Sequence, residues 1–336
     1  MSRPWILALA LALCCEAGVS EAPQALAEPM AVVGLADADC QACHPEVALQ
    51  WARSRHHASF TNVDFQRAYA REMLSFCRDC HAPGLVRAEA LPGAEAEALG
   101  IGCIDCHGAG DTIVTGPGAM VQAPHPLVRR EDFATRSCAR CHEFEFPPES
   151  HRPAGTMMQT TMREHRASIH GDRRCGDCHL PRGEDGGIDH TLSSVRDPEA
   201  LRRALAVSAR REGNDLIVDI TPRGVGHAFP TGDLNRRLAL HAELVAGGSV
   251  VAGNTRYLAR QFAARRREDG TLDPAFGWPV LDDRVHEATT IRLALDPAGK
   301  GELHWWIDLE RVDYRDDLRP ERSTIASWVR LAEGRL

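Results

Sequence analysis

Cysteine and histidine are the residues of this chain whose types and spacing can do chemistry. The 336 residues include 12 cysteines and 16 histidines. Ten of the cysteines follow one pattern, in which two cysteines are separated by two residues and followed at once by a histidine. The five occurrences are Cys40, Cys43 and His44; Cys77, Cys80 and His81; Cys103, Cys106 and His107; Cys138, Cys141 and His142; and Cys175, Cys178 and His179. Five copies of so specific a spacing do not arise by chance.

This pattern is typical of covalent haem attachment. Two thiols bond to one edge of the porphyrin, and the next residue, histidine, becomes the proximal ligand of the iron. A zinc ribbon, a thioredoxin-like redox pair and a set of disulfides each account for part of the cysteines, but none explains a histidine after every pair. The sequence therefore predicts five covalently attached haem c groups, with the five motif histidines as proximal ligands.

The second axial position of each iron decides between electron transfer and substrate chemistry, because a second strong ligand closes the iron. Five of the sixteen histidines lie in the motifs and eleven lie outside them. The surroundings of five outside histidines favour ligation, and these are His56, His125, His170, His190 and His227. For each of them the alternative is a solvated or locally hydrogen-bonded histidine.

The first two candidates come from an expected helix and a rigid loop. His56 and His57 end a stretch in which Val47 and Trp51 are spaced as on one helical face, and we favour His56. His125 stands between two prolines, in an extended segment suited to wrapping a haem.

The third candidate lies on a helix that we expect to begin at Met157. His165 and His170 are five residues apart, roughly 140° around a helix, and should not face the same iron. His170 is favoured, and Met158 or Met162 is a thioether alternative.

The last two candidates follow glycines. His190 comes after Gly186 and Gly187, and His227 lies in a glycine-containing loop whose backbone can approach a haem closely. His151 is a reserve ligand. Strand alternation places His241 and His304 on outward faces, and His286 has no readable pattern.

The start of the chain predicts export. Arg3 precedes an apolar run from Trp5 to Leu13, and small residues follow up to Ala25-Leu26-Ala27, as in a secretory signal peptide over residues 1–27. The nine-residue run is too short to cross a bilayer of about 30 Å, which weighs against the alternative of a membrane anchor. We expect a periplasmic protein with no transmembrane segment in the mature chain. Association of this protein with a membrane surface is an open alternative.

Composition limits the remaining function classes. A charged fraction of 26% excludes a disordered chain and a multispanning membrane protein. A net charge of −8 speaks against nucleic-acid binding. Aromatic residues make up only 5% of the chain, so we expect the porphyrins to form much of the core in the motif-bearing part.

The chain divides near residue 210, and the expected class is α+β. Residues 28–210 are predicted as a mainly helical and irregular haem domain, including a helix that begins at Asp197 and ends near Gly213. Residues 211–336 are predicted as an antiparallel, sandwich-like β domain. Its expected strands are Leu216–Ile220, Arg237–Val245, Val250–Tyr257, Ile291–Leu295 and Leu303–Leu309, with a long surface loop over Arg265–Asp283.

The row of motifs resembles that of multihaem cytochromes related to the tetrahaem cytochrome c-554 of nitrifiers. Trp51 to His56, Cys103 to Gly110 and Ser168 to His170 look like segments of that family, and Gly226 to Gly232 resembles part of a C-terminal β domain found in some members. The resemblance covers residues 38–195 well. It implies closely packed haem pairs, mostly with two histidine ligands, in a periplasmic electron carrier. Five motifs and an added β domain depart from the four-haem pattern.

Three hypotheses of function follow. The first is an electron carrier between redox protein partners, such as other cytochromes or a membrane-bound complex. The second is a multihaem oxidoreductase in which one open haem, most readily the fourth, acts on a small nitrogen or sulfur compound. The third makes the β domain a docking module. The supply of candidate histidines favours the carrier over the enzyme.

Overall fold

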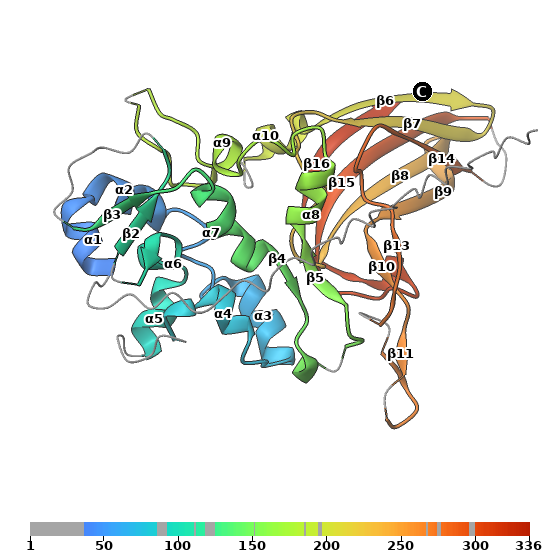
Figure 1. Cartoon of the computed structure of the whole chain (residues 1–336). Helices are drawn as coiled ribbons and strands as arrows, with labels where there is room; N and C mark the ends of the chain where they lie inside the picture. The colour runs from blue at the N-terminus through green and yellow to red at the C-terminus, as the bar shows by residue number, and fades with distance from the viewer. Residues whose placement is uncertain are drawn as a thin grey trace, which may run out of the picture.

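The computed structural model describes residues 37–85, 93–110, 112–117, 125–150, 152–184, 186–193, 197–266, 268–273, 277–295 and 300–336. The expected signal peptide and His151 lie outside the described residues. The fold is of the α+β class, with a region of short helices followed by antiparallel sheets, as predicted (Figure 1).

Short helices and small sheets form the N-terminal part. The helices are α1 (Asp37–Cys43), α2 (Pro45–Ala52), α3 (Val63–Arg71), α4 (Cys77–His81), α5 (Gly93–Leu99), α6 (Cys103–His107), α7 (Phe133–His142), α8 (Thr161–Ala167) and α9 (Gly176–His179), with 3-10 turns η1 (Pro83–Leu85) and η2 (Pro148–Ser150). Strands β1 (Gly108–Ala109), β2 (Thr112–Thr115) and β3 (Leu127–Arg129) form one sheet, and β4 (Glu143–Glu145) pairs with β5 (Met157–Thr160). Each attachment motif therefore lies in or beside a short helix.

The described polypeptide of this part has little apolar core of its own. Among its described residues, the buried apolar side chains before Leu205 are those of Phe60, Ala82, Ile104 and Met162. Flat apolar groups of the size of porphyrins would complement such a framework, because burial of apolar surface is the main force that holds a fold together.

The C-terminal part is a pair of packed antiparallel sheets, reached through α10 (Pro198–Arg203). One sheet has the order β14 (Thr289–Ala294), β7 (Asp215–Pro222), β6 (Leu205–Glu212). The other has the order β16 (Thr324–Arg335), β15 (Glu302–Tyr314), β8 (Arg236–Ala246), β9 (Ser249–Leu258), and η4 (Pro320–Arg322) precedes β16. Smaller pairs, β10 (Arg260–Phe262) with β13 (Pro279–Asp282) and β11 (Arg265–Arg266) with β12 (Leu272–Asp273), extend below the sheets in Figure 1.

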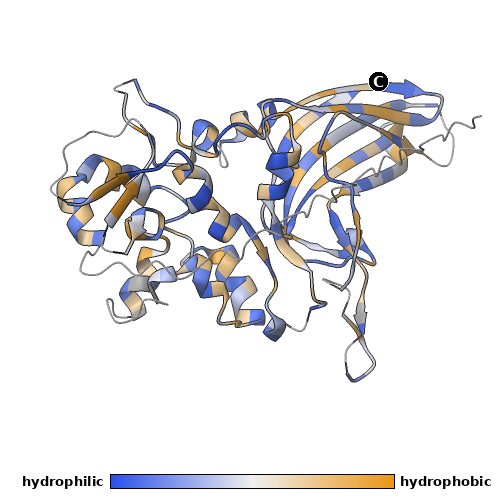
Figure 2. Cartoon of the chain, viewed as in Figure 1, coloured by the Kyte–Doolittle hydropathy of each residue, from blue (hydrophilic) through white to orange (hydrophobic). Residues whose placement is uncertain are grey.

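The two sheets enclose the hydrophobic core. Side chains from β7, β8, β14 and β15 belong to a single buried cluster, and Leu238, Leu240 and Ile307 in it are fully buried. Alternation along these strands is visible as alternating colours in Figure 2. The outward placement of His241 and His304 is confirmed, and His241 stacks on Trp306 with ring centroids 4.9 Å apart.

Three expectations about elements were wrong. The segment from Met157 begins as strand β5, and the helix starts only at Thr161, because Glu143–Glu145 offers a strand partner. The helix after Asp197 ends at Arg203, and β6 begins at Leu205 because β7 pairs along its whole length. Part of Arg265–Asp283, expected as a loop, forms β11 and β12, which pair as a local hairpin, and β13, which pairs with β10.

Candidate haem-binding site

Each motif places two thiols and one imidazole on about one helical turn. In the first and last motifs the histidine amide donates to the carbonyl of the first cysteine, His44 to Cys40 at 2.8 Å and His179 to Cys175 at 2.9 Å. The ten motif cysteines are all free of disulfides. The thiols are therefore available for attachment to one porphyrin edge, with the histidine beside them.

Folding brings three outside histidines opposite three motif histidines. The ring centroids of His56 and His142 are 6.5 Å apart, and those of His190 and His107 are 6.4 Å apart. Those of His227 and His179 are 6.2 Å apart, with an interplanar angle of 13°. In each pair one ring comes from a motif helix and the other from a loop.

This separation fits two imidazoles on the two sides of one iron. Metal–imidazole bonds are about 2.0 Å long, and a ring nitrogen lies roughly 1.1 Å from its ring centre when ring bonds are near 1.33 Å. Two rings bound to the same metal then have centres slightly more than about 6 Å apart. Direct stacking would bring the rings closer, so the pairs have the spacing of shared ligation.

Hydrogen bonds set the tautomers of the proposed ligands. The Nδ1–H of His81 donates to the Ser59 carbonyl at 2.9 Å, and that of His107 donates to the Val114 carbonyl at 2.9 Å. The Nδ1–H of His142 donates to Gln159 Oε1 at 3.2 Å. Since a carbonyl only accepts, Nδ1 carries the proton and Nε2 keeps the lone pair that binds iron.

Two of the facing histidines are oriented in the same way. The Nδ1–H of His190 donates to the Ile188 carbonyl at 2.9 Å, and that of His227 donates to the Ala228 carbonyl at 3.0 Å. Both loops therefore hold the imidazole in the tautomer that leaves Nε2 free for a metal.

Burial favours the neutral, metal-binding form of these rings. Burial, together with the nearby His56, lowers the pKa of His142 to about 4. Burial also lowers the pKa values of His56, His107 and His227 below the ordinary value for histidine. A neutral imidazole offers its lone pair without first losing a proton.

The motifs lie against one another. The thiols of Cys40 and Cys103 lie close enough to act on each other's charge, which joins the first and third motifs. Arg140 donates to the Asp105 carbonyl at 3.2 Å and Ser137 to the Cys106 carbonyl at 3.1 Å, which joins the third and fourth.

The fourth motif also contacts the second and the fifth. The thiols of Cys80 and Cys141 lie close enough to act on each other's charge, as do those of Cys138 and Cys175. The fourth motif therefore touches three of the other four motifs.

Two predicted distal ligands are not brought opposite a motif histidine. Among the described residues, no motif imidazole is in ring contact with His125 or His170. His125 lies just before β3, with its Nδ1 3.3 Å from the Pro126 carbonyl. His170 packs against Gly226. Their ligation stays a prediction.

An open haem was expected most readily at the fourth motif, but His56 lies opposite His142, the histidine of that motif. His57 instead packs on Trp51 with centroids 4.3 Å apart. The ring that stacks on His81 belongs to Phe65, at 3.7 Å, and no second imidazole contacts His81 within the described part of the chain.

The sequence offered no signal for several supporting residues. Gln159 lies on β5, which was expected to be helical, and its amide orients His142. Asp233 and Arg311, from the C-terminal part, lie close enough to His81 to act on its charge. Only the fold brings these residues to the motifs.

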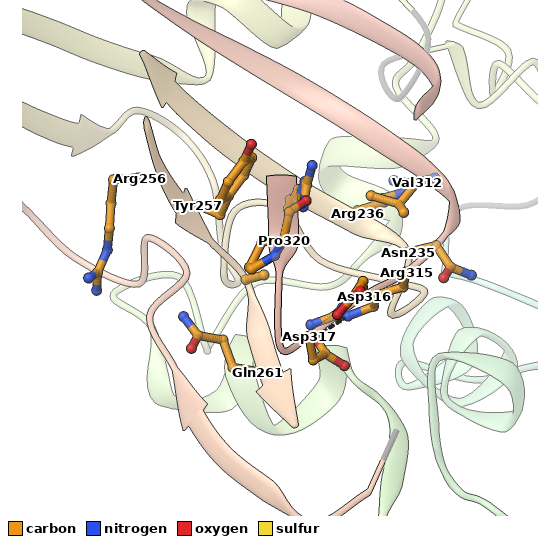
Figure 3. A pocket seen from close by; sticks show the side chains of 12 residues that line it. Asn235, Arg236, Arg256, Tyr257, Gln261, Val312, Arg315, Asp316, Asp317 and Pro320 are labelled. Carbon is orange, nitrogen blue, oxygen red and sulfur yellow. Dashed lines mark hydrogen bonds and ion pairs between the residues drawn. The ribbon is translucent and has the colours of Figure 1, made fainter. Parts of the chain in front are cut away.

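A pocket of about 220 Å³ in the C-terminal part is a separate feature (Figure 3). Four arginines line it, and each pairs with a carboxylate, namely Arg236 with Asp233, Arg237 with Glu310, Arg256 with Asp283 and Arg315 with Asp317. Its lining contains no histidine or cysteine. Carboxylates balance the charges of the four arginines, so the pocket gives no support for a second binding site.

Comparison with known proteins agrees with this geometry. The family model described as "Cytochrome c554 and c-prime" matches residues 39–108, which hold the first three motifs. The crystal structure of a penta-heme cytochrome c552 from Thermochromatium tepidum shares the fold, with a TM-score of 0.65 and 19% identity over 90% of this chain and 98% of that one. These findings support a multihaem c-type cytochrome.

The two comparisons cover different parts of the molecule. The family match is narrower than the resemblance over residues 38–195, whereas the shared fold reaches through the C-terminal sheets. No curated protein sequence matches the chain significantly. The family match over the first three motifs agrees with covalently bound haem c and a redox role. In the described residues, no helix is long and apolar enough to cross a membrane.

Proposed function

We propose that the chain is an exported electron carrier with five haem c groups, most of them held by two histidines. The observation that carries the proposal is the three facing pairs, His56 with His142, His190 with His107 and His227 with His179. Haem iron with two strong ligands takes up and releases electrons and has no position for a substrate. The fold shared with a protein named as a penta-heme cytochrome supports the count of five.

The contacts between motifs support a connected set of cofactors. Porphyrins attached to neighbouring motifs must themselves lie close together, because each thiol bonds to the porphyrin edge. The fourth motif contacts the second, third and fifth, and the third contacts the first. The chain thereby holds its cofactors in a branched path with the fourth motif at the junction.

Location and partners complete the proposal. The apolar N-terminal run and the small residues after it support secretion to the periplasm. The partners of such a carrier are redox proteins, including other cytochromes or a membrane-bound complex.

Two measurements on the purified protein test the proposal. The intact mass should exceed that of the processed polypeptide by five haems. The oxidised protein should be low-spin at the third, fourth and fifth irons. Each of the variants H56A, H190A and H227A should add a high-spin signal of about one haem in five. A high-spin majority in the unsubstituted protein would overturn the carrier.

A second candidate function has one observation in its favour. His81 is buried against Phe65, and no other imidazole contacts it within the described residues. An iron held there with one histidine ligand would have an open position for a small nitrogen or sulfur compound. The candidate for an open site is then the second motif instead of the fourth.

Ligand titration separates the two candidates. An open second haem predicts a high-spin signal of about one haem in five that shifts on adding nitrite, hydroxylamine or cyanide, together with steady-state turnover of one such compound. A wholly low-spin spectrum, unchanged by these ligands, would eliminate the oxidoreductase.

A further inference from the structure

The loop that carries His227 is held from two sides. On the side of the C-terminal sheets, the amides of Phe229 and Val285 each donate to the other's carbonyl, at 2.8 and 3.0 Å. On the side of the motifs, Ser168 Oγ donates to the Gly226 carbonyl at 3.2 Å. The position of the His227 imidazole therefore depends on both halves of the chain.

A buried ion pair crosses the same boundary. Arg284 Nη2 lies 2.6 Å from Glu164 Oε1 on α8, and both side chains are only 4% exposed. The other guanidinium nitrogen of Arg284 donates to the Pro230 carbonyl at 3.1 Å. Thr231 Oγ1 donates to Glu164 Oε2 at 2.6 Å. Arg284, Glu164 and Thr231, called here the loop clamp, tie the residues that follow His227 to α8.

The loop also fits tightly at the residue before His227. A Cβ at Gly226 would lie 3.1 Å from His165 Cδ2 and 3.2 Å from His170 Cβ. The backbone at this position is therefore packed closely against the last turn of α8 and the segment that follows it. A small displacement of the loop changes how the His227 ring faces His179, because the two ring centroids are already at the spacing of shared ligation, 6.2 Å.

We propose that Arg284, Glu164 and Thr231 are positioning residues that hold His227 opposite His179, so that ligation of the fifth iron depends on contact between the two halves of the chain. The inference rests on the proposed ligation of that iron by His227. Loss of Arg284 leaves the buried carboxylate of Glu164 on α8 without its partner and removes the bond to the Pro230 carbonyl, which loosens the attachment of the His227 loop to α8.

The test compares variants of the full haem-loaded protein. R284Q breaks the pair, and T231V removes a single hydroxyl if R284Q fails to fold. R237Q is the matched control, because Arg237 pairs with Glu310 at 2.7 Å with side chains 7% and 10% exposed, inside the sheet formed by β8 and β15. We expect R284Q to convert about one haem in five to high spin and T231V to convert a smaller fraction, whereas R237Q stays low-spin.

Further variants separate the clamp from the ligand. H227A should give the full high-spin signal of one haem, and R284K should restore part of the low-spin signal lost in R284Q. If H227A leaves the spin state unchanged, the proposed ligand is wrong. If H227A changes it but R284Q and T231V behave like R237Q, the ligand stands and the clamp is refuted.

Discussion

An imidazole binds iron through one nitrogen lone pair, so the hydrogen bond made by its other nitrogen decides whether it is ready to bind. Carbonyl or amide oxygens accept from Nδ1 of His107, His142, His190 and His227. These bonds fix the ring orientation and strengthen the ligand. At the scale of single residues, such bonds orient histidines outside the motifs as well as motif histidines.

Neighbouring histidines with different surroundings allow a sharp comparison. H56A should open the fourth iron and produce a cyanide-sensitive high-spin signal of about one haem in five. H57A should leave the spectrum unchanged, because the His57 ring packs on Trp51 and, among the described residues, is in ring contact with no motif histidine. Paramagnetic resonance of the oxidised proteins measures the difference. Equal spectra for the two variants would show that His56 does not bind iron.

At the scale of elements, ion pairs join α3 to the C-terminal sheets. Arg311 on β15 binds Asp64 on α3 at 3.2 Å and Asp233 in the loop before β8 at 2.8 Å. These three side chains are about one-fifth exposed, at 19%, 20% and 23%. A second pair, Arg71 with Asp313, joins the same elements, but its arginine is 47% exposed. The buried cluster, and not the exposed pair, should fix how the two parts meet.

Removal of each arginine measures this difference. R311Q leaves Asp64 and Asp233 with little solvent, and we expect the free energy of unfolding to fall by about 2–4 kcal/mol. R71Q should lower the free energy of unfolding by less than about 1 kcal/mol, because water screens the pair of Arg71 with Asp313. Denaturant unfolding of the haem-loaded protein, followed by circular dichroism, gives both values. Similar losses for the two variants would contradict the assigned role of the buried cluster.

The loss of unfolding free energy caused by R311Q should depend on pH. Burial alone raises the pKa of Asp233, but Arg311 and Arg236 outweigh it and hold that pKa below its usual range. A carboxyl with a depressed pKa adds stability above its unfolded pKa of about 3.9, and the gain is lost as pH falls through the folded value. The difference in unfolding free energy between R311Q and the unsubstituted protein should therefore shrink below about pH 4. A constant difference would exclude Asp233 as its source.

At the scale of the whole molecule, the contacts between motifs define the possible routes for electrons. The first motif lies at one end, beside the third, whereas the fourth contacts the second, third and fifth. Loss of the haem at the first motif leaves the other four haems connected, whereas loss of the haem at the fourth motif divides the remaining haems into separate groups. The fold therefore predicts unequal consequences for removing different cofactors.

Two double variants test this arrangement. C138A/C141A, which prevents attachment at the fourth motif, should divide reduction after a one-electron pulse into several separated phases. C40A/C43A, which removes the first haem, should keep the fast exchange of electrons among the other four haems. Time-resolved absorbance of the purified variants follows the phases, and haem content and circular dichroism confirm that each has folded. Equal kinetics in the two variants would refute a junction at the fourth motif.

The sequence by itself determined the local chemistry and the fold class. Two cysteines and the histidine that follows them occupy about one helical turn, so their spacing along the chain is already their spacing in space. Strand alternation likewise predicted the inward side chains Leu238 and Leu240, because the period of two is a property of any strand. The segment from Met157 was read as helix, because pairing with β4 is a contact that no local pattern contains.

Tertiary structure decided which histidine faces which motif. His56 lies opposite the fourth motif and His190 opposite the third, although each is closer in sequence to another motif. His227 reaches the fifth motif from the C-terminal part, held through Arg284 and Glu164. Such pairings depend on how separate elements pack, and packing is set by contacts between residues far apart in the chain. The histidine and cysteine content thus indicated the cofactors, while the fold selected which histidines face the motifs.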